Sequence, residues 1–209
     1  MFAGDVVNVS GWVDIDKEGS HYKDYFSNAK SYTVTNYKSE FCGYQGLSNE
    51  IFLNLEEELP DELINRFDVV FNHTVLEHIF EIEKAFKNLC LLSKDVVILV
   101  VPFLQQMHTN YGDYFRFSPL SIERMFVKNN MQLLYLNFNS HKNSSVYIFA
   151  IATKHPENWK NSIPTVIKNI ESKKPDDNFD AYIGCHAIQN RLFSLMLRIK
   201  KIFKMQLIN

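Results

Sequence analysis

The chain has 209 residues, of which 46% are hydrophobic and 22% charged, and its formal net charge is −2 at pH 7. This composition is typical of a soluble globular protein with room for one α/β domain and an appendage. The acidic balance argues against general nucleic-acid binding, and no run reaches the ~18 apolar residues of a membrane-spanning helix.

The three cysteines, Cys42, Cys90 and Cys185, are far apart and lack the spacing of metal ligands. The N-terminus has no basic region followed by an apolar stretch, which is the pattern of a signal peptide. We therefore expect reduced thiols, a cytoplasmic protein and a metal-independent activity.

The first half of the chain alternates between short apolar runs and polar segments. Residues 6–9 predict a strand that runs into Ser10-Gly11-Trp12, and residues 17–30 predict a crossover helix. Residues 31–35 predict a second strand that ends at Asn36. A third strand is expected over residues 51–55, followed by a short helical turn over 61–65.

The segment Phe67–Ile79, FDVVFNHTVLEHI, combines a buried strand with a polar turn. Its run of Val and Phe is typical of the interior of a parallel sheet. Asn72-His73-Thr74 follow at once, and Thr74 can cap the helical turn begun by Val75. Open α/β sheets bind ligands at the carboxyl ends of such strands, so this segment is the first candidate for a site.

Further along, residues 81–89 predict a helix and residues 96–101, VVILVV, predict a central strand. The polar and aromatic segment 105–116 comes next and can cover a ligand at the strand ends. Ser118 is the expected cap of a helix that starts at Pro119, so we assign it no chemistry. Strands over 132–136 and 145–152 would close the sheet.

Two segments resemble class I S-adenosylmethionine-dependent methyltransferases. Phe67–Ile79 is similar to the fourth strand and following turn of that family. Tyr111–Phe126, YGDYFRFSPLSIERMF, is similar to the segment after strand five in type 11/12-like members from glycan and natural-product clusters. The resemblance covers residues 6–152. It implies a doubly wound, mostly parallel, Rossmann-like seven-stranded sheet with an antiparallel edge strand and helices on both faces.

The resemblance also implies S-adenosylmethionine as cofactor and S-adenosylhomocysteine as product. The chain departs from the family pattern in the loop after the first strand, where only Gly11 remains, and at Asn36, where the family has an acid for the ribose hydroxyls. The positions implied for cofactor binding are Asn8, Ser10, Gly11, Asn36, Asn54, Leu55, Asn72, His73 and Thr74.

Methyl transfer needs an acceptor atom held in line with the methyl group and, for a hydroxyl, a base. Histidine is the usual base near neutral pH, which makes His73, His78 and His108 candidates. Our catalytic candidates are His108, His78 and Asp113, although His78 can brace the helical turn and Asp113 can pair with Arg116. The substrate-binding candidates are Tyr111, Tyr114 and Arg116, whose guanidinium suits an anionic group or a structural role.

Three functions are open, of which another nucleotide-using α/β enzyme has no specific support in the sequence. The first is a methyltransferase that O-methylates a sugar, a glycan precursor or another small metabolite. The second is a catalytically degenerate methyltransferase-like binding or scaffold protein, which the single glycine, Asn36 and Asn54 favour.

The C-terminal region differs from the rest in composition. We divide the chain into a methyltransferase-like domain over 1–154, a tether with one short helix near 163–170 within 155–190, and a basic amphipathic helix over 191–209. From Arg191 onward there are five basic and no acidic residues. Such a helix can lie on an anionic membrane, or pack on the domain or on a second subunit of a homodimer. Liposome flotation of the full chain, against a chain that ends at residue 190, separates these alternatives.

Overall fold

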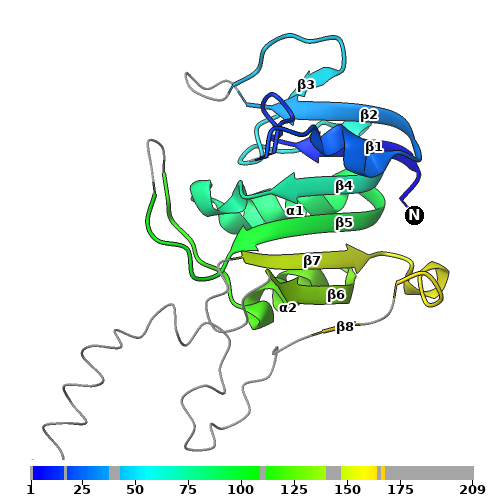
Figure 1. Cartoon of the computed structure of the whole chain (residues 1–209), viewed down its shortest axis with the longest axis vertical. Helices are drawn as coiled ribbons and strands as arrows, with labels where there is room; N and C mark the ends of the chain where they lie inside the picture. The colour runs from blue at the N-terminus through cyan, green and yellow to red at the C-terminus, as the bar shows by residue number, and fades with distance from the viewer. Residues whose placement is uncertain are drawn as a thin grey trace, which may run out of the picture.

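The computed structural model describes residues 2–16, 18–37, 43–108, 112–139, 147–163 and the backbone of 166–167. Within these residues, eight strands form one sheet in the order β3-β2-β1-β4-β5-β7-β6-β8 (Figure 1). The strands are β1 Gly4–Val9, β2 Ala29–Asn36, β3 Glu50–Phe52, β4 Phe67–His73, β5 Ser93–Pro102, β6 Gln132–Phe138, β7 Tyr147–Thr153 and β8 Val166–Ile167.

The predicted fold class is confirmed, with one strand more than the seven expected. Strands β3, β2, β1, β4 and β5 pair in parallel, while β7 lies between β5 and β6 and runs antiparallel to both. Strands β1, β4 and β5 are the apolar runs of the sequence, and they occupy the middle of the sheet because both of their faces are covered. The pairing of Val9 with Asn72, and of Asn72 with Leu99, brings the carboxyl ends of these strands together.

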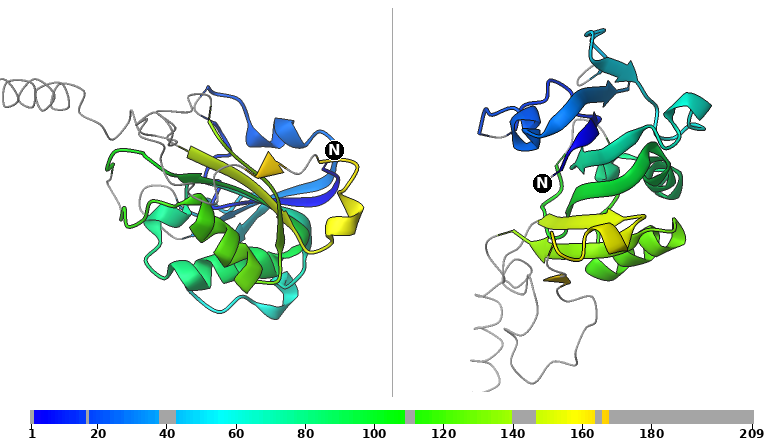
Figure 2. Two further views of the ribbon diagram at one scale, coloured as in Figure 1. Left: turned by 90° about the horizontal axis from the view of Figure 1, so that it is seen from below. Right: turned by 90° about the vertical axis from the view of Figure 1, so that its right-hand side faces the viewer.

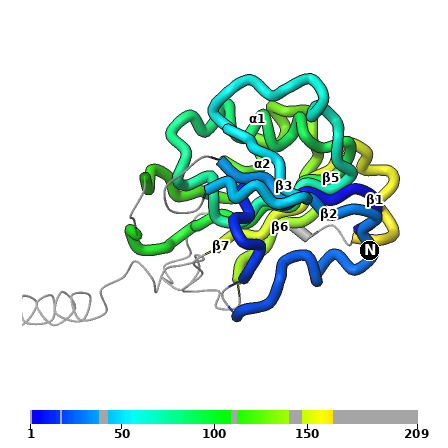
Figure 3. The backbone as a smooth tube through the Cα atoms, turned by 90° about the horizontal axis from the view of Figure 1, so that it is seen from above, coloured from blue at the N-terminus to red at the C-terminus, as the bar shows by residue number. Residues whose placement is uncertain are grey.

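The two faces of the sheet are covered differently. Helices α1 (Ile82–Leu92) and α2 (Pro119–Lys128) lie on one face, as Figure 2 shows. Their apolar sides meet the sheet, and the rings of Phe86 and Phe126 pack with centroids 4.8 Å apart. The segment between β1 and β2 lies on the opposite face, whereas the segment between β3 and β4 lies on the side of α1 (Figure 3).

Helix α2 begins as the sequence predicts. The Ser118 hydroxyl accepts a hydrogen bond from the Ser121 backbone N–H at 3.2 Å, and the Ser121 hydroxyl accepts one from the Ser118 N–H at 3.1 Å. Pro119 occupies the first turn, where its missing N–H costs nothing. The Phe117 backbone N–H donates to the Pro102 carbonyl at 2.9 Å, which fixes the segment before α2 to the end of β5.

The crossover helix expected over residues 17–30 is wrong. The chain forms a short 3-10 helix there, η1, over Tyr22–Phe26. The Asp16 carboxylate accepts hydrogen bonds from the backbone N–H groups of Glu18 and Ser20, which makes a turn where a helix would have begun. Phe26 nevertheless packs on the sheet, so this face is covered without an α-helix.

The region after β7 also differs from the expectation. The sheet-packed part continues past residue 154, since η5 (Pro156–Asn158) leads to Trp159, whose ring N–H donates to Asp95, and to the buried Ile163. A short helix was expected near residues 163–170. At Val166–Ile167 this prediction is wrong, because these residues form strand β8 and pair with β6.

The expected basic helix over 191–209 lies outside the described residues, and its membrane contact stays a prediction. Within the part of the chain that the structure describes, none of the helices has the length and apolar character needed to traverse a lipid bilayer.

Candidate functional site

A cavity of about 560 Å³ opens at the carboxyl ends of β1 and β4. Its size is within the range of small-molecule and cofactor sites. Seven of the nine residues predicted to bind a cofactor line it: Asn8, Ser10, Gly11, Asn54, Leu55, His73 and Thr74. Trp12, Tyr22, Tyr37 and His78 complete much of the wall. A larger groove of about 1060 Å³ lies between α1 and α2, away from the strand ends.

The turn after β1 has an unusual backbone for its sequence. Ser10, Trp12 and Asp14 have positive φ angles of 57°, 47° and 60°, a region that non-glycine residues seldom adopt. Gly11 cannot be replaced without movement, because a Cβ at this position would lie 2.4 Å from Asn8 Nδ2. The single glycine therefore stands where the close contact occurs, and strained residues make the rest of the turn.

Asp14 holds this turn in place. Its Oδ1 accepts hydrogen bonds from Asn8 Nδ2 at 2.7 Å and from the Tyr32 hydroxyl at 2.5 Å, and its Oδ2 accepts one from the Lys23 backbone N–H at 3.1 Å. Burial and the Asp14 carboxylate raise the pKa of Tyr32 far above its ordinary value. Asn8 therefore lines the cavity with an amide group that is already committed to Asp14.

Asn36 does not line the cavity. Its Oδ1 accepts from the Trp12 backbone N–H at 2.7 Å, and its Nδ2 donates to the Trp12 carbonyl at 3.1 Å and to Glu50 Oε1 at 2.6 Å. Burial opposes ionisation of Glu50, but hydrogen bonds from Asn36, Leu47 and Gln45 outweigh it and lower its pKa. Asn36 thus fastens the turn after β1 to β2, and the ribose contact implied for it has no support in this geometry.

Asn72 is also a brace and does not line the cavity. It is fully buried, and its Nδ2 donates to the Val9 carbonyl at 3.0 Å, which ties the ends of β1 and β4 together. Thr74 follows with a φ of 51° and donates its backbone N–H to the Val100 carbonyl at 2.8 Å. A β-branched residue in this conformation is an outlier, and such strain collects at functional sites.

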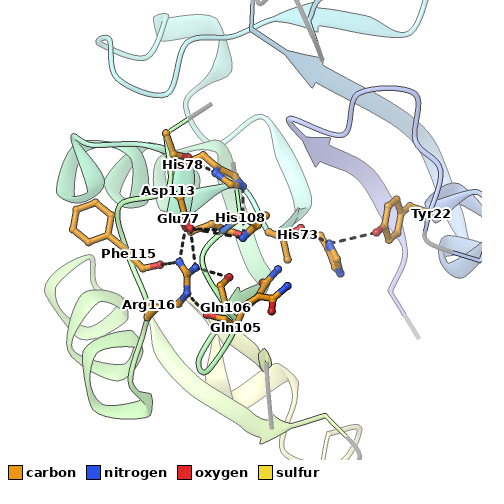
Figure 4. Close-up of polar contacts among 12 residues, drawn as sticks. Tyr22, His73, Glu77, His78, Gln105, Gln106, His108, Asp113, Phe115 and Arg116 are labelled. Atoms are coloured by element: carbon orange, nitrogen blue, oxygen red, sulfur yellow. Dashed lines mark hydrogen bonds and ion pairs between the residues drawn. The ribbon is translucent and has the colours of Figure 1, made fainter. Parts of the chain in front are cut away.

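His73 faces the cavity from the end of β4. Its Nδ1 lies 3.0 Å from Thr74 Oγ1 and 3.3 Å from the Tyr22 hydroxyl, whose pKa burial raises to about 12. Tyr22 comes from η1, so this contact joins the segment after β1 to the end of β4. In Figure 4 the pair lies apart from a second polar group.

That second group consists of Glu77, His78 and His108. Glu77 and His78 belong to the 3-10 helix η3 (Leu76–His78), and His108 comes from the segment after β5. The His78 and His108 rings meet edge to face with centroids 5.2 Å apart, and His78 Nε2 lies 3.8 Å from Glu77 Oε1. The Glu77 side chain is 0% exposed. Burial lowers the pKa of His78, although the Gly112 carbonyl that its Nδ1 contacts at 2.5 Å acts in the opposite sense.

The ion pair of Asp113 and Arg116 stabilises the segment between β5 and α2, to which both residues belong. All five N–H groups of the Arg116 guanidinium donate: to both oxygens of Asp113 and to the carbonyls of Gln105, Gln106 and Phe115. Asp113 Oδ2 also accepts the His108 backbone N–H at 3.0 Å. The Arg116 guanidinium holds the pKa of Asp113 well below its usual range. This geometry supports the structural alternative for both residues over the base and the substrate anchor.

Of the two remaining substrate-binding candidates, the structure describes one. Tyr114 is 53% exposed and its ring packs against Phe80 at 5.4 Å, whereas Tyr111 lies outside the described residues. Backbone N–H groups of Tyr114 and Phe115 donate to the Glu77 carbonyl, at 2.7 Å and 3.4 Å. The segment after β5 is therefore attached to η3 at the edge of the cavity.

Sequence reasoning missed Glu77, Asp14 and Glu50. All three are buried carboxylates, and those of Asp14 and Glu50 are bonded to side chains and backbone N–H groups from other parts of the chain. Glu77 carried a weak signal, since it stands next to the buried Leu76 in a helical turn. The sequence also showed no metal-ligand spacing, yet the fold gathers Glu77, His78 and His108 so that their ligand atoms lie within 4.8 Å of one another.

Comparison with known proteins found no matching family model and no similar curated protein. Solved structures do match. A Bacillus halodurans protein named as a methyltransferase aligns with a TM-score of 0.51 and 11% identity, over 71% of this chain and 91% of that one. A chain of a Haloferax volcanii complex between a methyltransferase and its activator gives 0.51 and 11%, over 73% and 83%.

The CurJ carbon methyltransferase gives a TM-score of 0.50 at 12% identity, over 73% of this chain and 49% of that one. The chain has the class I methyltransferase fold. In this methyltransferase fold the cavity lies where open α/β sheets bind their ligands, outside the carboxyl ends of the central strands.

Proposed function

We propose that the chain is an S-adenosylmethionine-dependent methyltransferase. The observation that carries this proposal is the cavity of about 560 Å³ at the ends of β1 and β4, within a methyltransferase fold. The loop after β1 lines this cavity, and so do Asn54 and Leu55 after β3. A cofactor in this place would be held by backbone contacts and aromatic walls more than by a ribose acid.

The cofactor supplies an electrophilic methyl group, and the protein positions the acceptor. Displacement at a methyl carbon is in line, so most of the rate enhancement comes from holding the acceptor atom opposite the sulfonium. His78 lines the cavity and His108 packs on its ring, which supports the proposal that these imidazoles act on the acceptor. One of them can accept the proton that a hydroxyl acceptor releases.

The acceptor that we propose is a hydroxyl of a sugar, a glycan precursor or another small metabolite. The support for the glycan part is the resemblance of residues 111–126 to methyltransferases of such pathways. The acidic net charge, which disfavours nucleic-acid acceptors, is consistent with it.

A binding or scaffold protein of the same fold is the second candidate. Asn36 and Glu50 occupy the place of the ribose acid with a closed network, which favours it. Trp12, which is 46% exposed, lines the same cavity. These features leave the cavity open but remove one polar contact that cofactor binding would use.

Methyl transfer from labelled S-adenosylmethionine to a panel of sugars, glycan precursors and small hydroxyl compounds tests the proposal. We expect His108→Ala to lower turnover by about 10²-fold, because general-base catalysis contributes that much or more, with the cofactor Kd unchanged. The matched control is His155→Ala, an exposed histidine on the segment after β7. Cofactor binding without transfer to any acceptor would favour the scaffold function.

A further inference from the structure

We propose that Glu77, His78 and His108 bind a divalent transition-metal ion at the acceptor edge of the cavity. One ligand atom from each residue lies within 4.8 Å of the other two. Two imidazoles and one carboxylate are a donor set that suits zinc and its neighbours, and imidazole nitrogen disfavours magnesium and calcium. The inference therefore concerns an ion of the zinc class.

The spacing of the three groups is close to that of a bound site. Ligand atoms of a tetrahedral ion with bonds of about 2.0 Å lie about 3.3 Å apart. His78 Nε2 and Glu77 Oε1 are already 3.8 Å apart, so about half an ångström of side-chain movement would close this edge. The other pairs of ligand atoms lie within 4.8 Å of one another, so they would have to approach by up to about 1.5 Å.

His78 is held in the orientation that a ligand needs. Its Nδ1 contacts the Gly112 carbonyl at 2.5 Å, and since a carbonyl can only accept, Nδ1 carries the hydrogen and donates it. Nε2 is then the basic nitrogen and faces Glu77. A metal-binding histidine almost always donates its other N–H in this way, which fixes its tautomer and its ring.

The charges around the group favour a cation. Glu77 is 0% exposed and Asp113 is 2% exposed, and the fixed positive charge beside them is that of Arg116. Arg116 is held by both Asp113 oxygens and also feels the charge of Glu77, so an ionised Glu77 would leave these three described residues with one negative charge in excess. A buried negative charge costs less when a bound cation compensates it.

The ligands come from two segments that are already attached. Glu77 and His78 follow β4, His108 follows β5, and the N–H of Tyr114 donates to the Glu77 carbonyl at 2.7 Å. Figure 4 shows the side chains of Glu77, His78 and His108 converging beside the Arg116 pair. A metal ion here would fasten the segment after β5 to η3.

The role of the ion rests on the proposed function, whereas its binding does not. His78 lines the cavity, so an ion bound to it would lie beside the space proposed for the cofactor and the acceptor. A hydroxyl bound to such an ion is acidified, because the positive charge stabilises the alkoxide, and its proton can pass to solvent. His78 and His108 would then act as ligands, and the metal would replace an imidazole base.

Metal titration of the full chain, freed of metal by dialysis, tests the inference. We expect calorimetry with zinc to show one site per chain. Cobalt bound in place of zinc should give the strong visible absorption of a four-coordinate cobalt ion. Glu77→Gln and His108→Ala should each weaken zinc binding by at least about 10-fold, since each removes a ligand. Zinc should raise the Tm of the wild type and not that of either variant.

The matched control is the exposed pair of His155 and Glu157, 3.7 Å apart, which offers the same chemistry without burial. A His155→Ala, Glu157→Gln double variant should bind zinc as the wild type does. If zinc binding is absent in the wild type, or is equal in the wild type, Glu77→Gln and His108→Ala, the inference is wrong. His108 is partly exposed, so its variant remains informative even where Glu77→Gln fails to fold.

The cofactor is measured separately on the metal-free protein. Zinc binding without S-adenosylmethionine binding would leave the metal site in place and contradict the proposed function. Cofactor binding without zinc binding would support the proposed function and contradict the metal site.

Discussion

Asp113 accepts two hydrogen bonds from Arg116 and one from the His108 backbone, and its side chain is 2% exposed. A carboxylate in this position stabilises the fold only while it is ionised. Its folded pKa is depressed, so its contribution is fully present above the pKa of an unfolded aspartate, about 3.9, and is lost as the pH falls toward the folded value.

Asp113→Asn should therefore destabilise the protein by about 2–4 kcal/mol near neutral pH, because it leaves Arg116 without its charged partner. The difference between wild type and variant should shrink as the pH is lowered below about 4. Urea unfolding followed over this pH range measures it. Asp61→Asn, at an exposed position in η2 (Asp61–Leu63), is the control and should cost little. A wild-type advantage that does not shrink in acid would contradict this account of Asp113.

Some of these residue roles were predictable and others were not. The cap at Ser118 is a local pattern, since the serine, the proline and the bonded N–H lie within four residues. The five bonds of Arg116 depend on carbonyls of residues 105 and 106, whose direction is set by the loop as a whole. Sequence alone therefore left Arg116 between a substrate anchor and a brace.

At the scale of elements, the turn after β1 is the part of the cavity wall whose backbone conformation departs most from the family pattern. The family pattern uses several glycines there, and this chain uses Gly11 with three strained residues held by Asp14 and Asn36. The network, and not the glycine content, sets the backbone that faces the cavity. A sequence comparison that counts glycines could not show this, because Tyr32 and Asp14 are 18 residues apart.

Tyr32→Phe should destabilise the protein by about 2 kcal/mol, because a part-buried hydrogen bond to a charged carboxylate is lost. It should also weaken cofactor binding, since the turn loses one of its anchors. Tyr25→Phe is the matched control: it removes a 2.6 Å hydrogen bond to the Asp16 carboxylate at an exposed position and should cost much less stability than Tyr32→Phe. Urea unfolding measures the loss of stability in both variants. Equal losses would mean that the hydrogen bond from Tyr32 to Asp14 stabilises the protein no more than the exposed one from Tyr25.

At the scale of the whole molecule, the central strands could be predicted from the sequence. The segment that covers the sheet after β1, and the side-chain contacts between distant segments, could not. The runs at residues 6–9, 68–71 and 96–101 are apolar because both faces of β1, β4 and β5 are buried, which is a direct physical signal. The helix expected over residues 17–30 failed because the Asp16 side chain captures two backbone N–H groups. His108 and Glu77 meet only because adjacent parallel strands end at the same edge, and no local pattern announces that contact.

The central claim is that the cavity at the ends of β1 and β4 binds S-adenosylmethionine, and a pair of matched variants tests it most directly. Val75 lines the cavity, and Val75→Trp would fill part of it, whereas Val127→Trp adds the same ring on the exposed side of α2. Calorimetry with S-adenosylmethionine and S-adenosylhomocysteine should show one site in the wild type and in Val127→Trp. Binding should be at least about 10-fold weaker in Val75→Trp, with the thermal unfolding of each variant recorded to exclude misfolding. No binding by the folded wild type, or equal binding by both variants, would contradict the account.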